Sequence, residues 1–323
     1  MINKEFFENG SVLDVDSTKD LLEVAGELRK KGNTPYILNI HNKENEKLNF
    51  VFPFDNFYLR FEDGFIEDDL YAKQLDEDGK ELTTWKTATI KVTGSHNIFE
   101  NLHVRNTSFD PIHKGQEVAL AVYGDDNLFI KGEMDSTQDT LFTGPLPDDL
   151  STRYMDFLPE AERYHEGNER NYYVDMIIKG TVDFIFGAGQ AIFYQDKLVS
   201  LNDGRKESYV AAPAHSLKDD FGFLFHSCSF EKEGAEAGSV YLGRPWRDYG
   251  KAVYAFCTYQ DHIAKAGFHD WSDVNRTRTA RFEEYPLRPD RVSWTRNKFF
   301  DNLPVRYINA VNELREVISA FDK

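Results

Sequence analysis

Three short segments of this 323-residue chain place reactive polar side chains inside runs of large apolar residues. They are residues 138–142, 182–187 and 242–247. Asp183 has apolar residues on both sides, so a strand there would bury a carboxylate, and an unpaired buried charge is strongly unfavourable. Arg244 is the natural partner, because a guanidinium binds a carboxylate through two hydrogen bonds. Asp183 is therefore predicted to be functional or, as the alternative, to form a structural ion pair with Arg244.

A pair of glutamines adds to this set. Gln116 and Gln138 lie 22 residues apart, and Asp139 follows directly. In a β-solenoid that spacing is close to one coil, so both amides would lie on one face beside Asp139. Two amides, two carboxyls and an arginine suit acyl transfer. One carboxylate attacks a carbonyl, the amides hold the oxyanion, and the second carboxyl protonates the leaving oxygen.

Other common chemistries lack their motifs. The sequence contains no G-x-S-x-G, no H-E-x-x-H and no G-x-G-x-x-G, and its nine histidines are scattered without ligand spacing. His113, His165, His215 and His262 are interpreted as surface or structural residues. We therefore expect no metal and no cofactor.

Many short β-type runs separated by turn residues would position these side chains. Residues 36–40, 88–92, 118–122 and 176–178 are examples. An aromatic residue is repeatedly followed, five residues later, by an apolar one; the pairs are Phe99 and Val104, Phe129 and Met134, Tyr173 and Ile178, Phe193 and Leu198, and Phe225 and Phe230. The intervals of 30, 44, 20 and 32 residues exclude a propeller. They suit a solenoid with loops of varying length, although a β-sandwich with aromatic core positions fits equally well.

Helical patterns occur only near the two ends of the chain. Ser17 and Asp20 form a capping signature before an apolar stripe, and Gly32 suits the end of that helix. A second short helix is predicted around Val311–Phe321, and both helices could cover exposed sheet edges. Residues 142–171 are expected to be a long surface excursion, and residues 63–81 a polar segment. Within the latter, residues 76–79 predict a hairpin turn rather than a calcium loop.

Composition limits the class of protein. The chain has 38 Lys and Arg against 55 Asp and Glu, a net charge of −17, which argues against nucleic-acid and anionic-membrane partners. With 14% aromatic residues the chain is expected to be globular. No stretch approaches the roughly 20 apolar residues of a membrane span. The two cysteines, Cys228 and Cys257, are expected to be buried and reduced. No signal-like segment follows Met1. We therefore predict a cytoplasmic protein, or a secreted one if a native signal was removed.

Four ordered motifs resemble the pectin methylesterase (pectinesterase) family of carbohydrate esterases. They are Gln116-Glu117-Val118-Ala119-Leu120, Gln138-Asp139-Thr140-Leu141, Asp183-Phe184-Ile185-Phe186-Gly187 and Leu242-Gly243-Arg244-Pro245-Trp246. The similarity runs from about Val15 to Tyr307. It implies an all-β fold, a right-handed parallel β-helix, with residues 1–323 as a single domain.

The resemblance also implies roles. Asp183 would attack the methyl ester carbonyl of a galacturonate unit, and Asp139 would protonate the departing methanol and then activate water. Gln116 and Gln138 would form the oxyanion hole. Arg244 would orient Asp183, lower the pKa of its carboxyl and keep it ionised, whereas burial and like charge raise the pKa of Asp139.

Further residues match family positions that line the sugar groove: Trp246, Trp271 and Phe186, for which core packing is the alternative. The implied partner is a methyl-esterified galacturonan or oligogalacturonide, acted on by a monomer. Glu117 departs from the family's usual small residue and is expected to add negative charge near the cleft. The 142–171 segment is expected to form a lobe over the groove that restricts which substrates enter. Together with the missing signal-like segment, this lobe leads to the hypothesis that the substrates are imported oligosaccharides rather than cell-wall polymer. An esterase or thioesterase with another substrate, and a non-catalytic carbohydrate-binding β-helix, are the alternatives.

Overall fold

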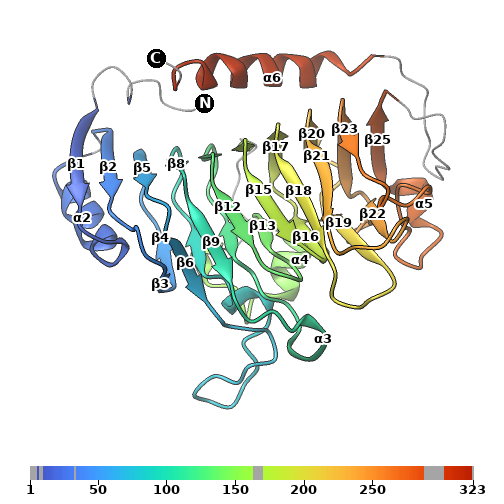
Figure 1. Ribbon diagram of the computed structural model, residues 1–323, viewed down its shortest axis with the longest axis horizontal. Coiled ribbons are helices and arrows are strands. Elements are labelled where there is room, and N and C mark those ends of the chain that lie inside the picture. Colours follow the sequence, from blue (N-terminus) through green and yellow to red (C-terminus); the bar gives the residue numbers. More distant parts are fainter. Residues whose placement is uncertain (1–5, 7–9, 33, 163–169, 287–301, 322–323) are drawn as a thin grey trace.

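Short strands stacked in three parallel sheets dominate the structure, a computed structural model that describes residues 6, 10–32, 34–162, 170–286 and 302–321 (Figure 1). Every pairing between named strands is parallel. Except at the two ends of the ten-stranded sheet, neighbouring strands in each sheet are separated by two strands along the chain, so successive turns of the chain lie on top of one another. The predicted parallel β-helix is confirmed, and the sandwich alternative is wrong.

The strands divide among the three sheets in regular rotation. Sheet A contains β1 (Ser11–Val15), β2 (Tyr36–Ile40), β5 (Phe57–Phe61), β8 (Ile98–Glu100), β11 (Leu128–Ile130), β14 (Arg170–Val174), β17 (Gln190–Tyr194), β20 (Phe223–His226), β23 (Lys251–Ala255) and β25 (Arg281–Tyr285). Sheet B contains β3 (Glu46–Lys47), β6 (Phe65–Asp68), β9 (His103–Asn106), β12 (Glu133–Asp135), β15 (Ile177–Gly180), β18 (Lys197–Leu201), β21 (Ser229–Glu233) and β24 (Thr258–Tyr259). Sheet C contains β4 (Phe50–Phe52), β7 (Ile90–Val92), β10 (Leu120–Val122), β13 (Leu141–Thr143), β16 (Val182–Gly187), β19 (Ser208–Pro213) and β22 (Val240–Gly243).

Helices are few and lie outside the sheets. They are α2 (Thr18–Lys30), α3 (Pro111–Lys114), α4 (Asp148–Arg153), α5 (Arg276–Thr279) and α6 (Val305–Ile318), with the 3-10 turns η1 (Thr84–Lys86) and η2 (Glu160–Glu162). No helix in the described part of the chain is long and apolar enough to cross a membrane.

The aromatic repeat forms one stack of rings inside the solenoid. Phe99 and Phe129 have ring centroids 4.7 Å apart, and Phe129 and Tyr173 have centroids 5.3 Å apart. The stack continues through Phe193 and Phe225 to Tyr254, with spacings of 4.6–4.7 Å. These spacings match the distance between neighbouring strands. The sequence repeat therefore marks the same position in successive coils of sheet A.

Removing one ring from this stack should destabilise the protein strongly. Phe129→Ala leaves a cavity between two rings that cannot close because each is held by its own strand, and we expect a loss of about 3–5 kcal/mol of unfolding free energy. Urea unfolding followed by circular dichroism measures this. Phe256→Ala, at a side chain 55% exposed, is the control and should change the unfolding free energy by less than about 0.5 kcal/mol. Equal losses in the two variants would contradict the role of the stack.

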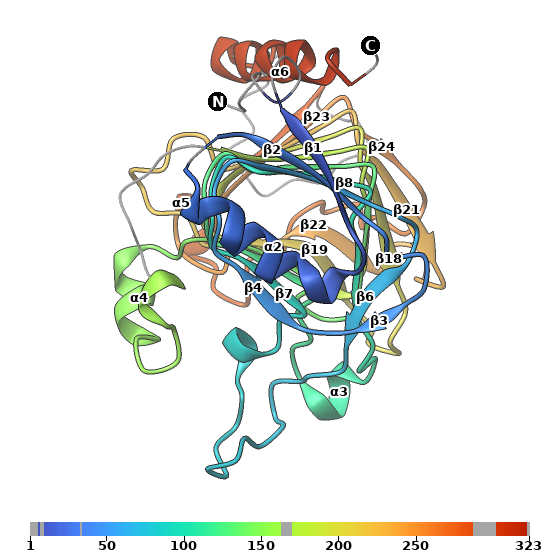
Figure 2. The ribbon, with the colours of Figure 1, turned by 90° about the vertical axis from the view of Figure 1, so that its left-hand side faces the viewer.

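Both predicted helices form, and they cover different parts of the solenoid. Helix α2 covers the open N-terminal end of the solenoid with Leu21, Ala25 and Leu28 (Figure 2). The Ser17 side chain makes no cap to the helix backbone and instead donates to Asp20 Oδ2 at 2.7 Å, so the capping prediction is wrong in its detail. Helix α6 is longer than predicted and lies along the outer face of sheet A rather than over an edge. The reason is a row of outward apolar side chains on sheet A that it buries, including Ile98, Leu128 and Ile192.

The polar segments are more ordered than predicted. The 63–81 stretch begins with strand β6, then forms a hairpin in which Asp76 Oδ1 accepts backbone hydrogen bonds from Asp78 and Lys80, as a turn requires. In the described residues no group of three or more His, Cys, Asp or Glu side chains could hold a metal ion. The surface segment expected over residues 142–171 begins within β13 and contains α4 and η2. Its residues 163–169, which include His165, lie outside the described residues.

The cysteines stack on neighbouring coils. Cys228 Sγ donates to the Phe193 carbonyl at 3.3 Å and Cys257 Sγ to the Phe225 carbonyl at 3.4 Å. Cys228 is buried, but Cys257 is only half-buried, contrary to expectation. Their reduced state in the cell, the cytoplasmic location and the single-domain assignment stay predictions.

Candidate active site

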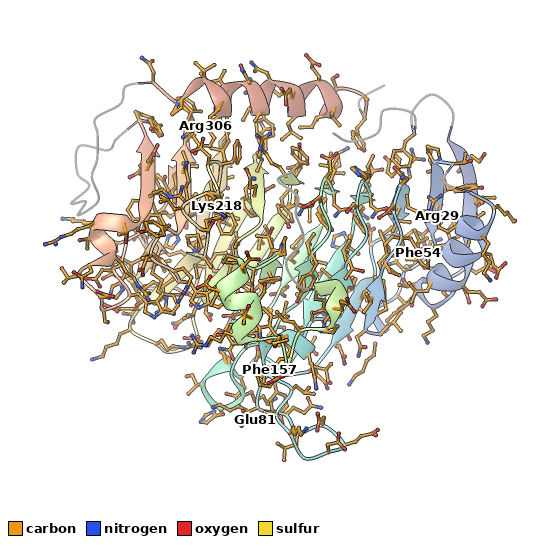
Figure 3. All side chains as sticks on the ribbon, turned by 180° about the vertical axis from the view of Figure 1, so that it is seen from behind. Arg29, Phe54, Glu81, Phe157, Lys218 and Arg306 are labelled. Atoms are coloured by element: carbon orange, nitrogen blue, oxygen red, sulfur yellow. The ribbon has the colours of Figure 1, made fainter. Side chains whose placement is uncertain are left out.

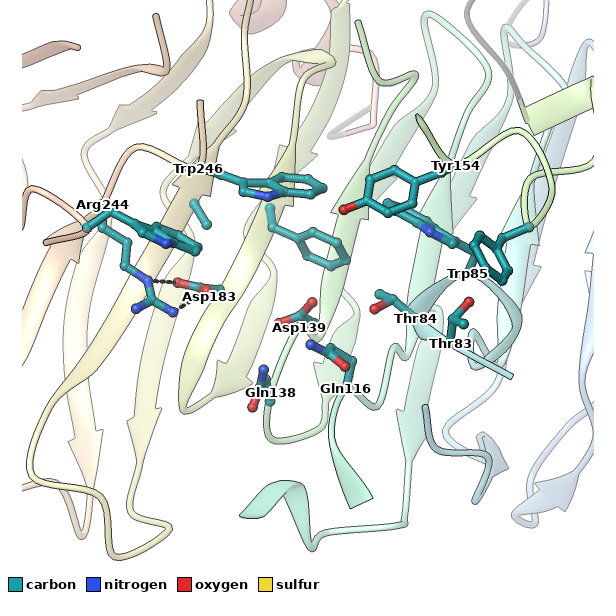
Figure 4. A pocket seen from close by; sticks show the side chains of 14 residues that line it. Thr83, Thr84, Trp85, Gln116, Gln138, Asp139, Tyr154, Asp183, Arg244 and Trp246 are labelled. Carbon is teal, nitrogen blue, oxygen red and sulfur yellow. Dashed lines mark hydrogen bonds and ion pairs between the residues drawn. The ribbon is translucent and has the colours of Figure 1, made fainter. Parts of the chain in front are cut away.

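Successive coils of sheet C bring the predicted residues together. Glu117 N donates to Gln138 O at 3.0 Å, and Asp139 N donates to Val182 O at 3.0 Å. Gln116, the pair Gln138 and Asp139, and Asp183 therefore lie on three consecutive coils, as the 22-residue spacing predicts. All four side chains line one pocket of about 290 Å³, together with Arg244 (Figure 4).

The backbone at both aspartates departs from regular strand geometry. Asp139 has φ of 66° and Asp183 has φ of 52°, values in the left-handed region that non-glycine residues rarely adopt. The pairing of β16 with β19 shifts in register between Val182 and Ile185, which is a β-bulge at Asp183. A bulge redirects side chains, and here Phe184 points into the core while Asp183 faces the pocket.

Asp183 and Arg244 form the predicted pair. Arg244 Nε donates to Asp183 Oδ1 at 2.8 Å and Nη2 donates to Oδ2 at 2.6 Å. The guanidinium is held from both faces, with its carbon 3.8 Å from the ring centroid of Tyr209 and 3.9 Å from that of Trp271. A planar cation fixed in this way orients the carboxylate that it binds.

The two buried carboxyls differ in acidity. Burial, followed by the charge of Asp183, raises the pKa of Asp139 well above its ordinary value. Burial also raises the pKa of Asp183, and the charge and hydrogen bonds of Arg244 oppose that rise. The expected direction of the Arg244 effect is therefore right, but the expectation of a net lowered pKa at Asp183 is wrong, because burial outweighs it. Asp183 still ionises before Asp139, so the pair carries one proton over a range of pH.

Aromatic rings form the opposite wall of the pocket. Figure 4 shows Trp246, Trp85 and Tyr154 along one side, facing Gln116, Gln138 and the two aspartates. Phe186 also lines the pocket and packs on Phe142 and Trp246, with centroid distances of 5.1 and 6.1 Å. Trp246, Trp271 and Phe186, the three aromatics expected at the sugar groove, all line this pocket, and their part in binding a sugar stays a prediction.

Glu117 does not face the cleft as expected. Its side chain is fully buried, Oε1 accepts the backbone N–H of Asp110 at 3.0 Å, and Oε2 accepts the hydroxyl of Thr137. The carboxylate thus anchors the segment before β10 and adds no charge to the pocket lining.

Sequence reasoning missed several pocket residues. Tyr209, which is not part of the pocket lining but packs on the Arg244 guanidinium, lies one coil after Asp183, in register with Val182, so its place could have been found by extending the coil spacing once more. Thr83, Thr84 and Trp85 come from the segment before β7, and Tyr154 and Phe157 from the segment after β13. No periodic signal marks these residues, because they lie outside the coils.

Comparison with known proteins gives the family and the fold. The family model described as Pectinesterase matches residues 35–146 and 162–302. Pectinesterase QRT1 of Arabidopsis thaliana is 31% identical over 233 residues, 70% of this chain and 54% of the relative. Pectinesterase 31 of the same plant is 29% identical over 226 residues, 68% of this chain and 62% of the relative. The chain spans about half the length of the curated relatives it matches, 54% and 47% for the first two.

Solved structures share the fold. The pectin methylesterase PemA from Erwinia chrysanthemi superposes with a TM-score of 0.67 at 22% identity, covering 91% of this chain and 98% of that one. The pectin methylesterase from carrot superposes with a TM-score of 0.65 at 20% identity, covering 85% and 81%.

Proposed function

Since this chain belongs to the pectinesterase family, we propose that it hydrolyses methyl esters of galacturonate units to carboxylate and methanol. One observation carries the proposal. Asp183, held in two hydrogen bonds by Arg244, lies in the same pocket as a second buried carboxyl, Asp139, and the amides of Gln116 and Gln138.

In the first half of the proposed reaction, the Asp183 carboxylate attacks the ester carbonyl carbon. The carbonyl oxygen becomes an oxyanion, which accepts hydrogen bonds from the amides of Gln116 and Gln138. The carbon–methoxy bond then breaks, and protonated Asp139 gives its proton to the leaving oxygen, so methanol departs. The product of this half is an acid anhydride between Asp183 and the galacturonate.

In the second half, Asp139 is now a carboxylate and takes a proton from water. The water oxygen attacks the galacturonate carbonyl, the anhydride bond breaks, and Asp183 leaves as a carboxylate stabilised by Arg244. Asp139 is again protonated, and the site returns to its starting state. The raised pKa of Asp139 supports this dual role, because it holds the proton at a pH where Asp183 is ionised.

The aromatic wall supports a sugar ester over a small ester or thioester. Trp246 lines the pocket opposite the reactive side chains, and an indole ring is a surface on which pyranose rings stack through their apolar C–H face. The alternative of a non-catalytic carbohydrate-binding β-helix does not require a buried carboxyl pair, whose burial opposes ionisation of both groups.

The direct test is methanol release. The protein is incubated with methyl-esterified pectin and with short methylated oligogalacturonides, both with EDTA present, and methanol is measured. We expect methanol from at least one of these substrates. Absence of methanol from both would overturn the proposed function, and hydrolysis of an unrelated ester alone would favour the esterase alternative.

A further inference from the structure

Two segments outside the coils meet at one end of the pocket. The first is residues 69–87, which connects β6 to β7, and the second is residues 144–162, named the lobe from this point on. Trp85 of the first segment and Tyr154 of the lobe have ring centroids 5.1 Å apart. Trp85 also packs on Phe142 at 5.4 Å and on Trp246 at 6.4 Å, and only 6% of it is exposed. The two segments thus touch across the groove beside β7.

Both segments are firmly attached to the solenoid. In the lobe, Lys91 Nζ lies 2.8 Å from Glu162 Oε1 in a largely buried ion pair, and Asp149 pairs with Arg247 after β22. Leu146, Leu150 and Leu158 of the lobe are buried in the same apolar cluster as Trp85. In the other segment, Ala72 N donates to Gln116 O at 3.0 Å. Figure 3 shows Phe157 of the lobe and Glu81 of the 69–87 segment on the same side of the molecule, away from α6.

The two segments therefore bound the pocket beside the reactive residues. Thr83, Thr84 and Trp85, with Tyr154 and Phe157, line the same pocket as Asp139 and Asp183, and its volume is about 290 Å³. That is at the lower end of the roughly 300–1,000 Å³ of ligand pockets. A polymer reacting at an internal unit must extend in both directions from that unit, and these two segments bound the pocket on one side.

From this closure we propose that the site accepts short methyl-esterified oligogalacturonides, with the reacting ester on the unit at a chain end. The inference rests on the proposed function and narrows it. A chain end fits because the unit beyond it is missing on the side that Trp85 and Tyr154 close.

The experiment compares fully methylated trigalacturonide with methyl-esterified pectin polymer at equal ester concentration. We expect kcat/KM per ester at least 10-fold higher on the trimer, and mass spectrometry of the first product should find the free carboxylate on a terminal unit. Equal or higher kcat/KM on the polymer, or first demethylation spread over internal units of longer oligomers, would overturn the inference while leaving the proposed function standing. No methanol from either substrate would instead remove the proposed function itself.

Variants of the closing residues sharpen the test. Tyr154→Ala and Phe157→Ala remove rings from the lobe side, whereas Trp85 stays because its ring is buried in the core. We expect each variant to raise the polymer-to-trimer ratio of kcat/KM. Phe256→Ala, an exposed phenylalanine beside α6, is the matched control and should leave the ratio unchanged. If Tyr154→Ala and Phe157→Ala both fold and both keep the polymer-to-trimer ratio of kcat/KM seen in Phe256→Ala, these two residues do not close the pocket to polymer.

A separate observation concerns Arg205, in the turn between β18 and β19. Its Nη1 donates to Gln138 Oε1 at 2.9 Å, and its Nη2 lies 2.9 Å from Asp203 Oδ2. Asp203 Oδ1 in turn accepts the backbone N–H of Arg205 at 3.1 Å, so the turn holds the guanidinium in place.

This contact decides which end of the Gln138 amide faces the reactants. Arginine has only donors, so it can bind the amide oxygen and not the amide NH₂ group. With Oε1 held by Arg205, the NH₂ group points to the other side, where its hydrogen bond to Asp139 lowers the pKa of that carboxyl. The charge of Arg205 also lowers the pKa of both Asp139 and Asp183.

We infer that Arg205 is a positioning residue that fixes the Gln138 amide with its N–H groups toward the reacting oxygen. It acts through Gln138 and, like the first inference, presupposes the proposed hydrolysis. Without this arginine the amide can turn over and present its oxygen, which repels an oxyanion.

Three variants test this role, with methanol release from the better substrate as the assay. Arg205→Met should lower kcat by about 10- to 100-fold with KM within about 3-fold, since removing one oxyanion donor entirely is worth 10²–10³. Its pH–rate profile should also move to higher pH, because the cation that lowers the pKa of both carboxyls is gone. Arg205→Lys keeps the charge and should keep the pH limits while recovering only part of kcat. Lys206→Met, at the exposed neighbouring residue, is the control for loss of one positive charge.

Coupling to Gln138 gives the decisive comparison. In a Gln138→Ala background, Arg205→Met should cause little further loss of kcat at the pH optimum, because the amide that it positions is absent. A kcat and pH profile equal to those of Lys206→Met, or fully additive losses with Gln138→Ala, would overturn the positioning role. If no variant and no wild-type protein releases methanol, the proposed hydrolysis fails first.

Discussion

Replacing Asp183 by Asn is expected to lower kcat for methanol release by at least about 10⁴-fold, since loss of a covalent nucleophile removes the reaction path itself. Asn has nearly the same shape and tolerates the positive φ of 52° at this position. Its amide oxygen can still accept a hydrogen bond from Arg244, whose guanidinium stays between Tyr209 and Trp271. The variant should therefore fold, and KM or substrate binding should change far less than kcat.

Circular dichroism and the thermal midpoint check that fold directly. Asp135→Asn is the matched control, because it removes a partly buried carboxyl on sheet B, outside the pocket. We expect wild-type turnover from that control. Turnover of Asp183→Asn within 10-fold of the wild type would remove Asp183 as the nucleophile and leave Asp139 as the only buried carboxyl in the pocket lining to take its place.

The second large effect is expected at Asp139, where Asn should lower kcat on methyl esters by about 10²–10⁴-fold through loss of general acid and base catalysis. The loss should depend on the leaving group. A trifluoroethyl ester releases a much less basic alcohol, which departs without help from an acid, so the first half of the reaction recovers. The second half still lacks its base, so we expect a burst of about one equivalent of alcohol per enzyme followed by slow release.

The pH dependence gives a second readout of the same variant. In the wild type, kcat/KM should fall as the pH rises through the raised pKa of Asp139, because the protonated acid is lost. It should also fall as the pH drops through the pKa of Asp183, because the nucleophile becomes protonated. Asp139→Asn should keep the fall at low pH and lose the fall at high pH. The same fold-loss for both esters, with no burst, would contradict the assigned role.

The repeat in the sequence suited a solenoid and a sandwich equally well, and the resemblance to the pectinesterase family decided for the β-helix. The rings from Phe99 to Tyr254 recur once per coil at equivalent positions, and a residue pattern that repeats in space also repeats in the chain. The grouping of Gln116, Gln138 and Asp139 followed for the same reason, since Gln116 and Gln138 belong to neighbouring coils at a spacing the sequence displays. Arg244 was paired with Asp183 from charge alone, because a carboxylate among apolar residues needs a partner.

The features that the sequence did not predict lie mostly in the connecting segments, outside the repeating coils. Trp85 and Tyr154 reach the pocket from segments of unrelated length, and their contact depends on how two loops fold over the coils. Arg205 was missed because its partner, Gln138, is 67 residues away and on another coil. Glu117 was assigned to the cleft from its neighbour Gln116, although successive residues point to opposite sides and it is buried. The acidity of Asp183 was misjudged because the balance between burial and the charge of Arg244 depends on the whole fold.

The stacked rings have a consequence for how such a protein can change. The intervals between them range from 20 to 44 residues, yet the ring spacing stays within 4.6–5.3 Å. Because each coil is aligned by its own ring, a loop can gain or lose residues without shifting the coils above and below it. Lengthening the connection after β13 thus leaves Asp139 and Asp183 in place. Substrate range can therefore diversify in the loops by insertion and deletion, while the reactive centre is inherited unchanged.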